Sequence, residues 1–506
     1  MKFDKIKSLF HKLQQKPVIA CAVLAILLTF ILEILGRRSL LEAIQYFVGS
    51  PMMFFYNALI IMLTLSLALL FKRRYFILSL ISIIWLGFGI ANFVLLGFRT
   101  TPFSAIDLTL VPYALSIIDV YLSKAEIITL TVILVLVLIG IIIIAIRAPK
   151  HKEKIHYLRS IIVVATLSAL VVLFSVIGSQ TQILESRFGN LAAAYENYGF
   201  AYCLSNSFID TGIKKPQTYS EETMNGIIND LNQDDGAEDA ATPNIIFIQL
   251  ESFFDINYLK NVQFSENPLP NFTKLKEEYP SGFLNVPSVG AGTANTEFEV
   301  ITGMSLDYFG AGEYPYKTIL LEETCESLPY NLKERGYNAF AIHNNRASFY
   351  GRNEVFCSLG FDTFISKEYM QDLEYTGASW AKDECLIDEI LKSLNSTENQ
   401  DFVYTITVEG HGKYSSKVLD GTETLEFTMP DNYDQEAYAA FFKLQQDVDQ
   451  FIGDLIDALE QVDEETVLVM YGDHLPSLEI QASDLENGNV YQTEYVIWNN
   501  MDLKAE

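Results

Sequence analysis

Residues 466–474 read TVLVMYGDH, in which an apolar run (466–471) is followed at once by a glycine, an acid and a histidine. A run that is apolar on both faces is typical of a strand buried inside a parallel sheet. Three further runs of this kind are NIIFIQL (244–250), YNAFAI (337–342) and DFVYTITV (401–408). Helical periodicity is visible at 383–394 and 435–460. The alternation predicts an α/β domain over residues 244–506, with a mainly parallel central sheet covered by helices on both sides.

The residues that follow these predicted strands are polar and reactive. In chain order they are Glu251, His343, Glu409-Gly410-His411 and Asp473-His474. Ligands of open α/β sheets bind beyond the carboxyl ends of the strands, so we expect these acids and imidazoles to share one edge. The chain has six histidines, and the three in the predicted domain all stand at strand ends.

Glu251, Asp473 and His474 form a set of two carboxylates and one imidazole. This combination suits a divalent cation such as Mn²⁺, Zn²⁺ or Mg²⁺. In the alternative interpretation, Asp473 caps the following turn and His474 satisfies a backbone group. The acid-histidine pair directly after a buried strand favours the metal site.

Residues 288–303, SVGAGTANTEFEVITG, supply a candidate nucleophile. A glycine-rich turn leads into Thr293 at the start of a predicted helix, where free N–H groups and the helix dipole favour a phosphate. Metal coordination can make such a hydroxyl a nucleophile. Thr293 could equally be an N-cap, with Thr296 or Glu297 completing a capping box. Spacing alone does not separate the two roles, and they are compatible.

The segment HNNRASFYGRNEVF (343–356) gathers imidazole, guanidinium and aromatic groups after a predicted strand. Arginine is suited to bidentate contacts with phosphate, which makes Arg352 a candidate ligand-binding residue. A solvated loop is the alternative. His411, after the third predicted strand, is a candidate phosphate donor or general acid.

The first third of the chain has the composition of a membrane domain. Five apolar stretches of about 20 residues are long enough to cross a bilayer. They lie near 18–36, 52–71, 75–97, 126–146 and 160–178. We therefore predict a five-span transmembrane domain at residues 1–179, followed by a juxtamembrane helix and acidic linker at 180–243. Within the linker, Ala192–Ala194 fit either a cleavage site or an ordinary helix, which we favour, and DLNQDDGAEDAATP (230–243) predicts a flexible tether.

Charge divides the chain in the same way. Residues 1–179 hold 17 Lys and Arg against 7 Asp and Glu, a net charge of +10, whereas the remainder holds 18 against 56, a net charge of −38. This contrast excludes a single soluble globule, and the acidity argues against nucleic acid as a partner. A cytoplasmic N-terminus places 13 basic residues in the inner segments and four outside, so we expect the α/β domain to be extracellular at the cell membrane. We interpret the five cysteines as small apolar residues and leave one disulfide open.

The chain resembles the lipoteichoic acid synthase family, membrane phosphoglycerol transferases of the alkaline phosphatase–sulfatase superfamily. The resemblance rests on the five spans and on QLESFFD, GTANTEFEVITG, HNNRASFYGRN, VEGHGKY and YGDHLP, which occur in the family's order. It implies one divalent ion, Mn²⁺ ahead of Mg²⁺ or Zn²⁺, with Thr293 as nucleophile. The implied metal ligands are Glu251, Thr293, Asp473 and His474. The implied contacts to glycerol phosphate are His343, Tyr350, Arg352 and His411.

The resemblance also implies a reaction. Phosphatidylglycerol in the membrane would donate glycerol phosphate to Thr293, and a polyglycerolphosphate or glycolipid acceptor would then take it. The sulfatase signature Cys/Ser-x-Pro-x-Arg is missing at the nucleophile, which argues against sulfate esters. Alternatives are phosphoethanolamine transfer, phosphoglycerol transfer to an oligosaccharide, and an inactive membrane sensor or scaffold.

Three departures from the family pattern stand out. Tyr350 occupies a position where the best-known members have tryptophan, and the nucleophile loop reads GTANTEF where polymer-making members have GKTSDSEF. The sequence also stops at YVIWNNMDLKAE (495–506), whereas the family normally adds further strands and helices. We therefore expect a C-terminally truncated chain, with YQTEYVIWNN (491–500) as the start of another strand.

Overall fold

A computed structural model gives the structure of the protein as two compact units. It describes residues 16–97, 99, 101–116, 123–150, 154–184, 191–209, 212–213, 215–216, 218–231, 242–310, 312–412, 414–422, 425–478, 480–501 and 503. Unit 1 comprises residues 1–211 with 310–312, and unit 2 comprises 212–309 with 313–506. Most of the acidic stretch at 230–243 lies outside the described residues.

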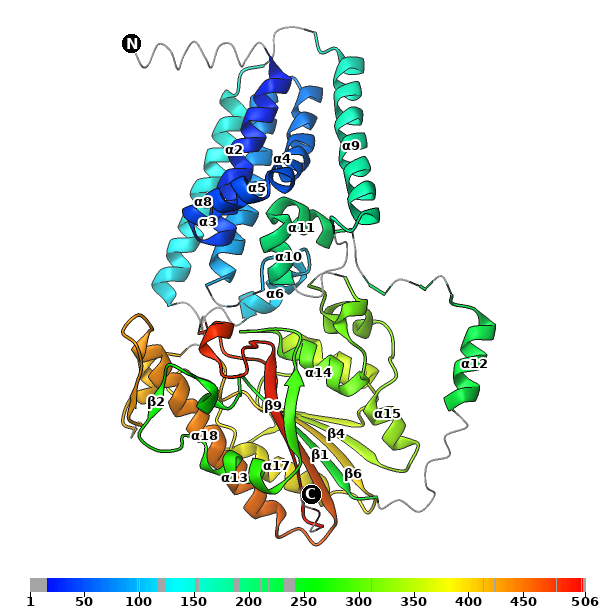
Figure 1. The fold of residues 1–506 in the computed structure, drawn as a ribbon, viewed down its shortest axis with the longest axis vertical. Helices are drawn as coiled ribbons and strands as arrows, with labels where there is room; N and C mark the ends of the chain where they lie inside the picture. Colours follow the sequence, from blue (N-terminus) through cyan, green and yellow to red (C-terminus); the bar gives the residue numbers. More distant parts are fainter. Residues whose placement is uncertain are drawn as a thin grey trace. The chain divides into compact units, whose positions relative to one another are not determined.

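Unit 1 is helical and contains five helices that are long and apolar enough to cross a membrane, which confirms the predicted spans. They are α2 (Pro17–Arg37), α4 (Pro51–Ser66) with its extension η1 (Leu67–Leu70), α5 (Arg74–Leu95), α8 (Lys124–Arg147) and α9 (Tyr157–Gln180) (Figure 1). Shorter helices are α3 (Leu40–Gly49), α6 (Asp107–Ser116), α10 (Leu191–Tyr198) and α11 (Phe200–Ser207). The three-alanine run lies inside α10, as the helical interpretation predicted.

The short helix α11 is fastened to the long helices of unit 1 by buried polar contacts. A carboxylate oxygen of Glu33 on α2 accepts the Phe200 N–H at 2.9 Å, and Asn57 Oδ1 on α4 accepts the Tyr202 N–H at 2.8 Å. These two N–H groups belong to the first turn of α11, where the helix supplies no partners of its own. Residues 200–207 thus pack as part of unit 1.

Unit 2 is built on a seven-stranded sheet with the order β3-β9-β8-β1-β6-β4-β5. The strands are β1 (Asn244–Leu250), β3 (Ser281–Asn285), β4 (Asn338–His343), β5 (Thr363–Ser366), β6 (Asp401–Ile406), β8 (Thr466–Gly472) and β9 (Gln492–Asn499). The five strands from β8 to β5 are parallel, and β9 and β3 run antiparallel at one side. This confirms the mainly parallel sheet and the four predicted strands. The strand predicted at 491–500 is β9, whereas β3 and β5 had not been predicted.

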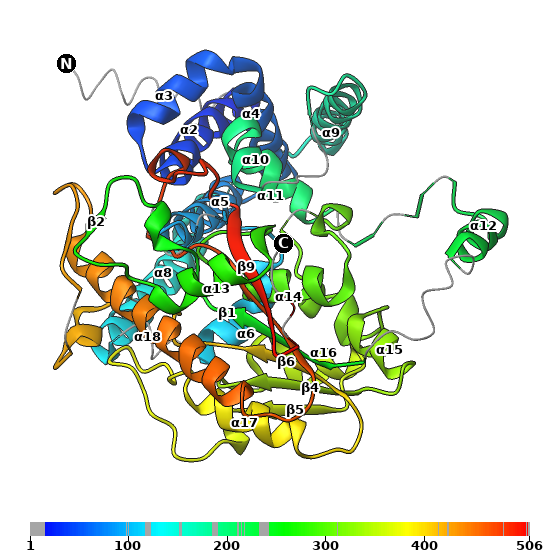
Figure 2. The same ribbon diagram turned by 60° about the horizontal axis from the view of Figure 1, so that its bottom comes forward.

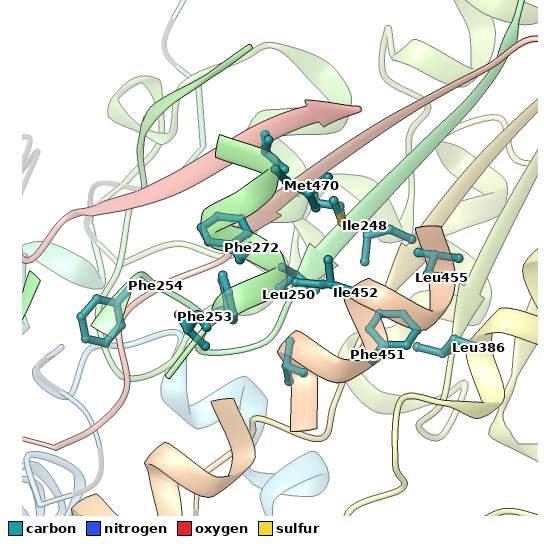
Figure 3. Close-up of a cluster of buried hydrophobic side chains, with 14 of the residues drawn as sticks. Ile248, Leu250, Phe253, Phe254, Phe272, Leu386, Phe451, Ile452, Leu455 and Met470 are labelled. Carbon is teal, nitrogen blue, oxygen red and sulfur yellow. The ribbon is translucent and has the colours of Figure 1, made fainter. Parts of the chain in front are cut away.

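Helices cover both faces of this sheet, as predicted. On one face lie α13 (Pro270–Glu278), α17 (Cys385–Leu394) and α18 (Gln435–Leu459), and on the other α14 (Thr293–Thr302), α15 (Leu328–Lys333) and α16 (Arg352–Ser358) (Figure 2). Successive residues of β1 alternate between the two cores, because side chains of a strand point to opposite faces. Ile246, Ile248 and Leu250 join the α17–α18 core, part of which is drawn in Figure 3.

Two smaller features complete unit 2. Strands β2 (Gln263–Phe264) and β7 (Phe427–Thr428) form a separate two-stranded ribbon, and helix α12 (Glu221–Leu231) precedes the sheet in sequence.

All five cysteines of the chain are free, so the disulfide that the sequence left open is not formed.

The parallel register brings the ends of the predicted strands together. Leu250 of β1 pairs with Gly472 of β8, and His343 of β4 pairs with Ile406 of β6. The residues that follow these positions therefore emerge at one edge of the sheet, which is the edge where α/β proteins bind their ligands.

Candidate active site

Three buried side chains meet at the carboxyl ends of β1 and β8. The ligand atoms of Glu251, Asp473 and His474 all lie within 4.8 Å of one another. His474 Nε2 is 3.4 Å from Asp473 Oδ2 and 3.8 Å from Glu251 Oε1. Each of the three residues is at most 3% exposed. The structure thus assembles, from two strands, the carboxylate-imidazole set that the sequence suggested.

Hydrogen bonds around this group orient its ligand atoms. Asp473 Oδ1 accepts the Ser252 N–H at 2.7 Å, and Ser252 Oγ donates to Glu251 Oε1 at 3.0 Å. His474 Nδ1 lies 3.0 Å from the carbonyl oxygen of Leu475. A carbonyl can only accept, so Nδ1 carries the hydrogen and Nε2 presents its lone pair to the two carboxylates. This tautomer is the one that binds a metal through Nε2.

The residues present fit a divalent cation. Among the described residues, Asp473 Oδ2 and His474 Nε2 are buried without a hydrogen-bond partner. Burial, with the neighbouring Glu251 as second cause, raises the pKa of Asp473 well above its usual range, and burial lowers the pKa of His474. Unpaired buried acceptors are costly, and a cation held between two carboxylates and a neutral imidazole would relieve that cost.

Thr293 stands beside this group at the start of α14. Its Oγ1 donates a hydrogen bond to Glu251 Oε2 at 3.1 Å. The N-cap is Gly292, whose φ of +106° lies in a region that favours glycine. A Cβ at Gly292 would also lie only 2.4 Å from Ser288 Oγ. The glycine-rich turn therefore lets the chain turn sharply and deliver the Thr293 hydroxyl to the carboxylate.

The capping-box interpretation of Thr293 is wrong, because Gly292 holds the N-cap position and no side chain caps the helix. The two residues that would have completed the box have other partners. Thr296 Oγ1 donates to the carbonyl oxygen of Asp473 at 2.8 Å. Glu297 forms an ion pair with Arg352. One face of α14 thus forms a hydrogen bond to Asp473 and an ion pair with Arg352 of α16.

Arg352 is buried and held by two hydrogen bonds to Glu297. Its Nε donates to Glu297 Oε2 at 3.0 Å and its Nη2 donates to Glu297 Oε1. The side chains are 1% and 0% exposed, so the pair is shielded from solvent. Arg352 Nη1 has no partner among the described residues. Its guanidinium carbon lies 5.2 Å from the centre of the Tyr350 ring. The arginine therefore retains one N–H-bearing nitrogen for a ligand.

His343 and His411 stand at the ends of the neighbouring strands. His343 Nδ1 is 2.9 Å from the carbonyl oxygen of Ile406, and burial followed by the charge of Arg352 lowers the pKa of His343 well below its usual value. His411 Nδ1 is 2.7 Å from the Gly412 carbonyl oxygen, and its ring centre lies 4.4 Å from that of Trp380.

A second buried carboxylate pair was not predicted as part of the site. Asp383 Oδ1 accepts the N–H groups of Val408 and Glu409, and Glu409 Oε2 accepts the Asp383 N–H at 2.8 Å. Burial is the main cause that raises the pKa of Asp383 to about 6 and that of Glu409 to about 8. Glu409 follows a predicted strand, but nothing local marks Asp383, which approaches it only through folding.

Lys317 and Tyr314 were also missed. Lys317 Nζ lies 5.5 Å from the centre of the Tyr350 ring, and the rings of Tyr314 and Tyr350 stack with their centres 6.0 Å apart. The segment GEYPYKT (312–318) has no strand-end position and no ligand spacing that would have singled these residues out.

Comparisons with known proteins agree with this architecture. The model of the sulfatase family matches residues 243–506. A Rhizobium meliloti protein proposed to modify cyclic beta-1,2-glucan is 29% identical over 286 residues, 56% of this chain and 43% of that protein. Lipoteichoic acid synthase 2 of Bacillus subtilis is 26% identical over 245 residues, 46% of this chain and 35% of that protein. The chain thus spans less than half the length of these two relatives.

Solved structures extend the likeness. Phosphoglycerol transferase GacH of Streptococcus pyogenes, in complex with sn-glycerol 1-phosphate, has a TM-score of 0.50 and 25% identity, covering 57% of this chain and 78% of that chain. Lipooligosaccharide phosphoethanolamine transferase A of Neisseria meningitidis has a TM-score of 0.52 and 14% identity, covering 95% of this chain and 88% of that chain. The second shares the layout of membrane helices followed by a soluble domain.

These matches and the described fold lead to one classification. The sulfatase model covers slightly more than half of the chain, over the whole of the seven-stranded sheet and its covering helices. The five apolar helices make the chain a multi-pass membrane protein with a C-terminal soluble domain. The chain belongs to the sulfatase family, as a lipoteichoic acid synthase-like membrane member of it.

Proposed function

We propose that this protein is a phosphoglycerol transferase that moves glycerol phosphate from phosphatidylglycerol to a polyglycerolphosphate or glycolipid acceptor. The observation that carries the proposal is the position of Thr293. Its hydroxyl lies at the N-terminus of α14 and donates to Glu251, within the carboxylate-imidazole group. A helix N-terminus attracts a phosphate, and a neighbouring carboxylate orients the hydroxyl for attack. The names of the relatives, a lipoteichoic acid synthase and a phosphoglycerol transferase, support the substrate class.

The proposed reaction has two balanced steps. Thr293 Oγ1 attacks the phosphorus of the lipid headgroup, the bond from phosphorus to the diacylglycerol oxygen breaks, and the hydroxyl proton ends on that oxygen. The product is a glycerophospho-threonine. An acceptor hydroxyl then attacks the same phosphorus, and Thr293 recovers its proton. Splitting the transfer in this way gives ping-pong kinetics.

A divalent ion fits the site, and we propose Mn²⁺ ahead of Mg²⁺ or Zn²⁺. Glu251, Asp473 and His474 would hold it together with the Thr293 oxygen. When bound, it would supply positive charge that lowers the pKa of the Thr293 hydroxyl and stabilises the negative charge that develops on the phosphoryl oxygens. Ser252 and Leu475 keep the carboxylate oxygens and the imidazole in the orientation that such an ion requires.

We propose that His343, Tyr350, Arg352 and His411 contact the glycerophosphate. Arg352 Nη1 can donate to a phosphate oxygen, because Glu297 occupies only the other two nitrogens. His343 donates through Nδ1 to a carbonyl, so its neutral ring presents Nε2 as an acceptor. An acceptor suits a glycerol hydroxyl better than a phosphate oxygen. The tyrosine ring would pack against the glycerol carbons.

We further propose that the N-terminus is cytoplasmic and that the catalytic domain, residues 244–506, is extracellular. The basic residues of the membrane half are concentrated in the segments that this orientation places inside. A lipid headgroup in the outer leaflet and a catalytic domain on the same side of the membrane would then be accessible to each other.

A second candidate acceptor is an oligosaccharide. The Rhizobium meliloti relative is proposed to modify a cyclic glucan, and it matches more of this chain than the Bacillus subtilis synthase does. The chemistry at Thr293 would be the same for both acceptors, so the first half-reaction does not distinguish them. Incubation of the loaded enzyme with glucan and with a glycolipid would show which one removes the phosphoglycerol.

Intact-protein mass spectrometry of the full chain in detergent, with Mn²⁺ and phosphatidylglycerol, tests the proposal. We expect one glycerophosphate on Thr293. Thr293→Ala should abolish it, and Thr302→Ala is the matched control, because that hydroxyl lies on the same helix and donates to the Phe298 carbonyl away from the site. Phosphatidylethanolamine replaces phosphatidylglycerol in a parallel sample to test the alternative headgroup.

The outcomes separate the alternatives. An adduct from phosphatidylethanolamine alone would replace the donor and keep the nucleophile. An adduct that persists in Thr293→Ala would refute the proposed mechanism. No adduct from either lipid, with no divalent metal retained by the purified protein, would favour the scaffold interpretation.

A further inference from the structure

Lys317 is a buried lysine close to the candidate active site. It ends the short helical turn η4 (Pro315–Lys317) and is 8% exposed. Its backbone N–H donates to the Tyr314 carbonyl at 2.8 Å, which fixes the turn. Lysine is almost never buried this deeply unless its charge is paired.

Two cations lie against one aromatic ring at this place. Lys317 Nζ is 5.5 Å from the centre of the Tyr350 ring, and the Arg352 guanidinium carbon is 5.2 Å from the same centre. Glu297 uses both of its oxygens on Arg352, so that pair is internally balanced. The charge of Arg352 opposes protonation of Lys317, and the charge of Glu354 favours it. An anion placed beside the Tyr350 ring would therefore be attracted by both cations.

The turn that carries Lys317 also lies close to the candidate nucleophile, Thr293. The ring of Tyr314 stacks on Tyr350 at an interplanar angle of 17°. Tyr314 OH lies 3.7 Å from the position that a Cβ on Gly292 would occupy, directly before Thr293. The turn that carries Lys317 therefore lies beside the N-terminus of α14, where Thr293 meets Glu251.

We propose that Lys317 is a further substrate-binding residue, and that its ammonium group contacts the phosphodiester of the lipid headgroup. The proposal rests on the phosphoglycerol transfer proposed above. A phosphodiester carries one negative charge and would lie near both Lys317 and the free Nη1 of Arg352. A lysine supplies a compact point charge, while the arginine supplies directed N–H groups.

Binding should then be linked to protonation of this lysine. Burial, followed by the charge of Arg352, lowers the pKa of Lys317 to about 7. Below that pH the ammonium is already charged, and an anion binds without taking up a proton. Above it the free site is increasingly neutral, so binding takes up a proton and the affinity falls as the pH rises. Lys317→Arg should remove this linkage, since guanidinium stays charged.

Titration calorimetry of the full chain in detergent, supplied with Mn²⁺, tests the proposal. The probe is glycerophosphoglycerol, a headgroup diester that does not titrate near neutral pH, and Thr293→Ala in every sample prevents transfer. Measurements in two buffers of different ionisation enthalpy, about one pH unit below and above pH 7, count the protons taken up. We expect proton uptake only at the higher pH, and none with Lys317→Arg.

Lys317→Met keeps the length of the side chain without the charge. At the lower pH it should weaken diester binding by about tenfold to a hundredfold, the usual effect of losing a charge-assisted contact. Lys333→Met is the matched control, because it removes a lysine of unit 2 that pairs with Asp362 on the surface. Melting temperatures of all variants show whether they fold.

The outcomes separate the role of Lys317 from the proposed phosphoglycerol transfer. Unchanged affinity in a folded Lys317→Met protein would overturn the role of Lys317 and leave phosphoglycerol transfer standing. Binding of glycerophosphoethanolamine in place of glycerophosphoglycerol, with the same dependence on Lys317, would overturn the proposed donor and support the lysine. If neither diester binds the metal-supplied protein, both proposals fail.

Discussion

The three histidines of unit 2 share one hydrogen-bonding arrangement. His343, His411 and His474 each place Nδ1 within 3.0 Å of a backbone carbonyl oxygen. Because the carbonyl only accepts, each ring when neutral carries its hydrogen on Nδ1 and presents a lone pair on Nε2. At His474 this lone pair faces two carboxylates and suits a cation. At His343 it suits a hydroxyl. The backbone therefore sets the chemistry of each imidazole before any ligand arrives.

Glu409 provides a pH-dependent prediction. Burial and the neighbouring Asp383 raise the pKa of Glu409 to about 8, from a usual value of 4.5. The stability that depends on its proton is full below about pH 4.5 and is lost as the pH rises to about 8. Glu409→Gln cannot ionise. We expect the variant to gain stability relative to the wild type as the pH rises, by at most about 1.4 kcal/mol per pH unit in this window.

Thermal unfolding at several pH values measures this difference. Glu398→Gln, at an exposed carboxylate, controls for the change in net charge. A difference between Glu409→Gln and the wild type that stays constant with pH would contradict the prediction.

At the residue scale, the sequence predicted the groups that follow strands and missed those that arrive from elsewhere. Glu251 and His474 were recognisable because an acid or a histidine directly after a buried strand must emerge at the sheet edge. Lys317 and Asp383 reach the site through packing between segments far apart in the chain. No local spacing encodes such contacts.

At the scale of elements, the start of α14 decides the position of the nucleophile. Gly292→Ala places a Cβ 2.4 Å from Ser288 Oγ at a φ of +106°. We expect a loss of stability above the roughly 1–2 kcal/mol that left-handed backbone alone costs, together with loss of the adduct on Thr293. Thermal unfolding and the mass-spectrometric assay measure the two effects.

Gly303 at the other end of α14 is the matched control. It also has a positive φ, +67°, but a Cβ there meets nothing within 4 Å. Gly303→Ala should therefore show only the backbone cost. Equal losses in the two variants would mean that the contact with Ser288 has no consequence.

Strand length and burial explain which elements the sequence revealed. The strands β1, β4, β6 and β8 are six or seven residues long and largely buried, so their apolar runs stand out. In contrast, β3 has no buried residue, and β5 has four residues of which one is buried. Such strands are held by pairing with a neighbour and have little hydrophobic signal of their own.

At the scale of the whole molecule, the five spans could be predicted because run length and polarity are local properties of the sequence. The boundary between the two units could not be predicted in this way. The α11 segment joins unit 1 through buried contacts from Glu33 and Asn57, two polar residues inside otherwise apolar helices. Hydropathy alone could not show that these residues hold a later segment of the chain.

Cys357 allows the proposed orientation to be tested. It is exposed in unit 2, whereas Cys21 and Cys203 are buried in unit 1. A membrane-impermeant maleimide should label Cys357 in intact cells if unit 2 is extracellular. Cys357→Ser should lose most of this labelling. Labelling that requires permeabilised cells would contradict the proposed orientation.

The pairing of β1 with β8 has a consequence for biosynthesis. The hydrogen bond from Ser252 to Asp473 joins residues that are 221 positions apart. A ribosome must therefore translate the 221 positions that separate them before the two halves of the carboxylate-imidazole group can meet. Closing so long a segment is slow compared with local helix formation. During that interval the nascent chain has Glu251 but lacks His474, so it cannot assemble the three-residue group until translation has passed that histidine.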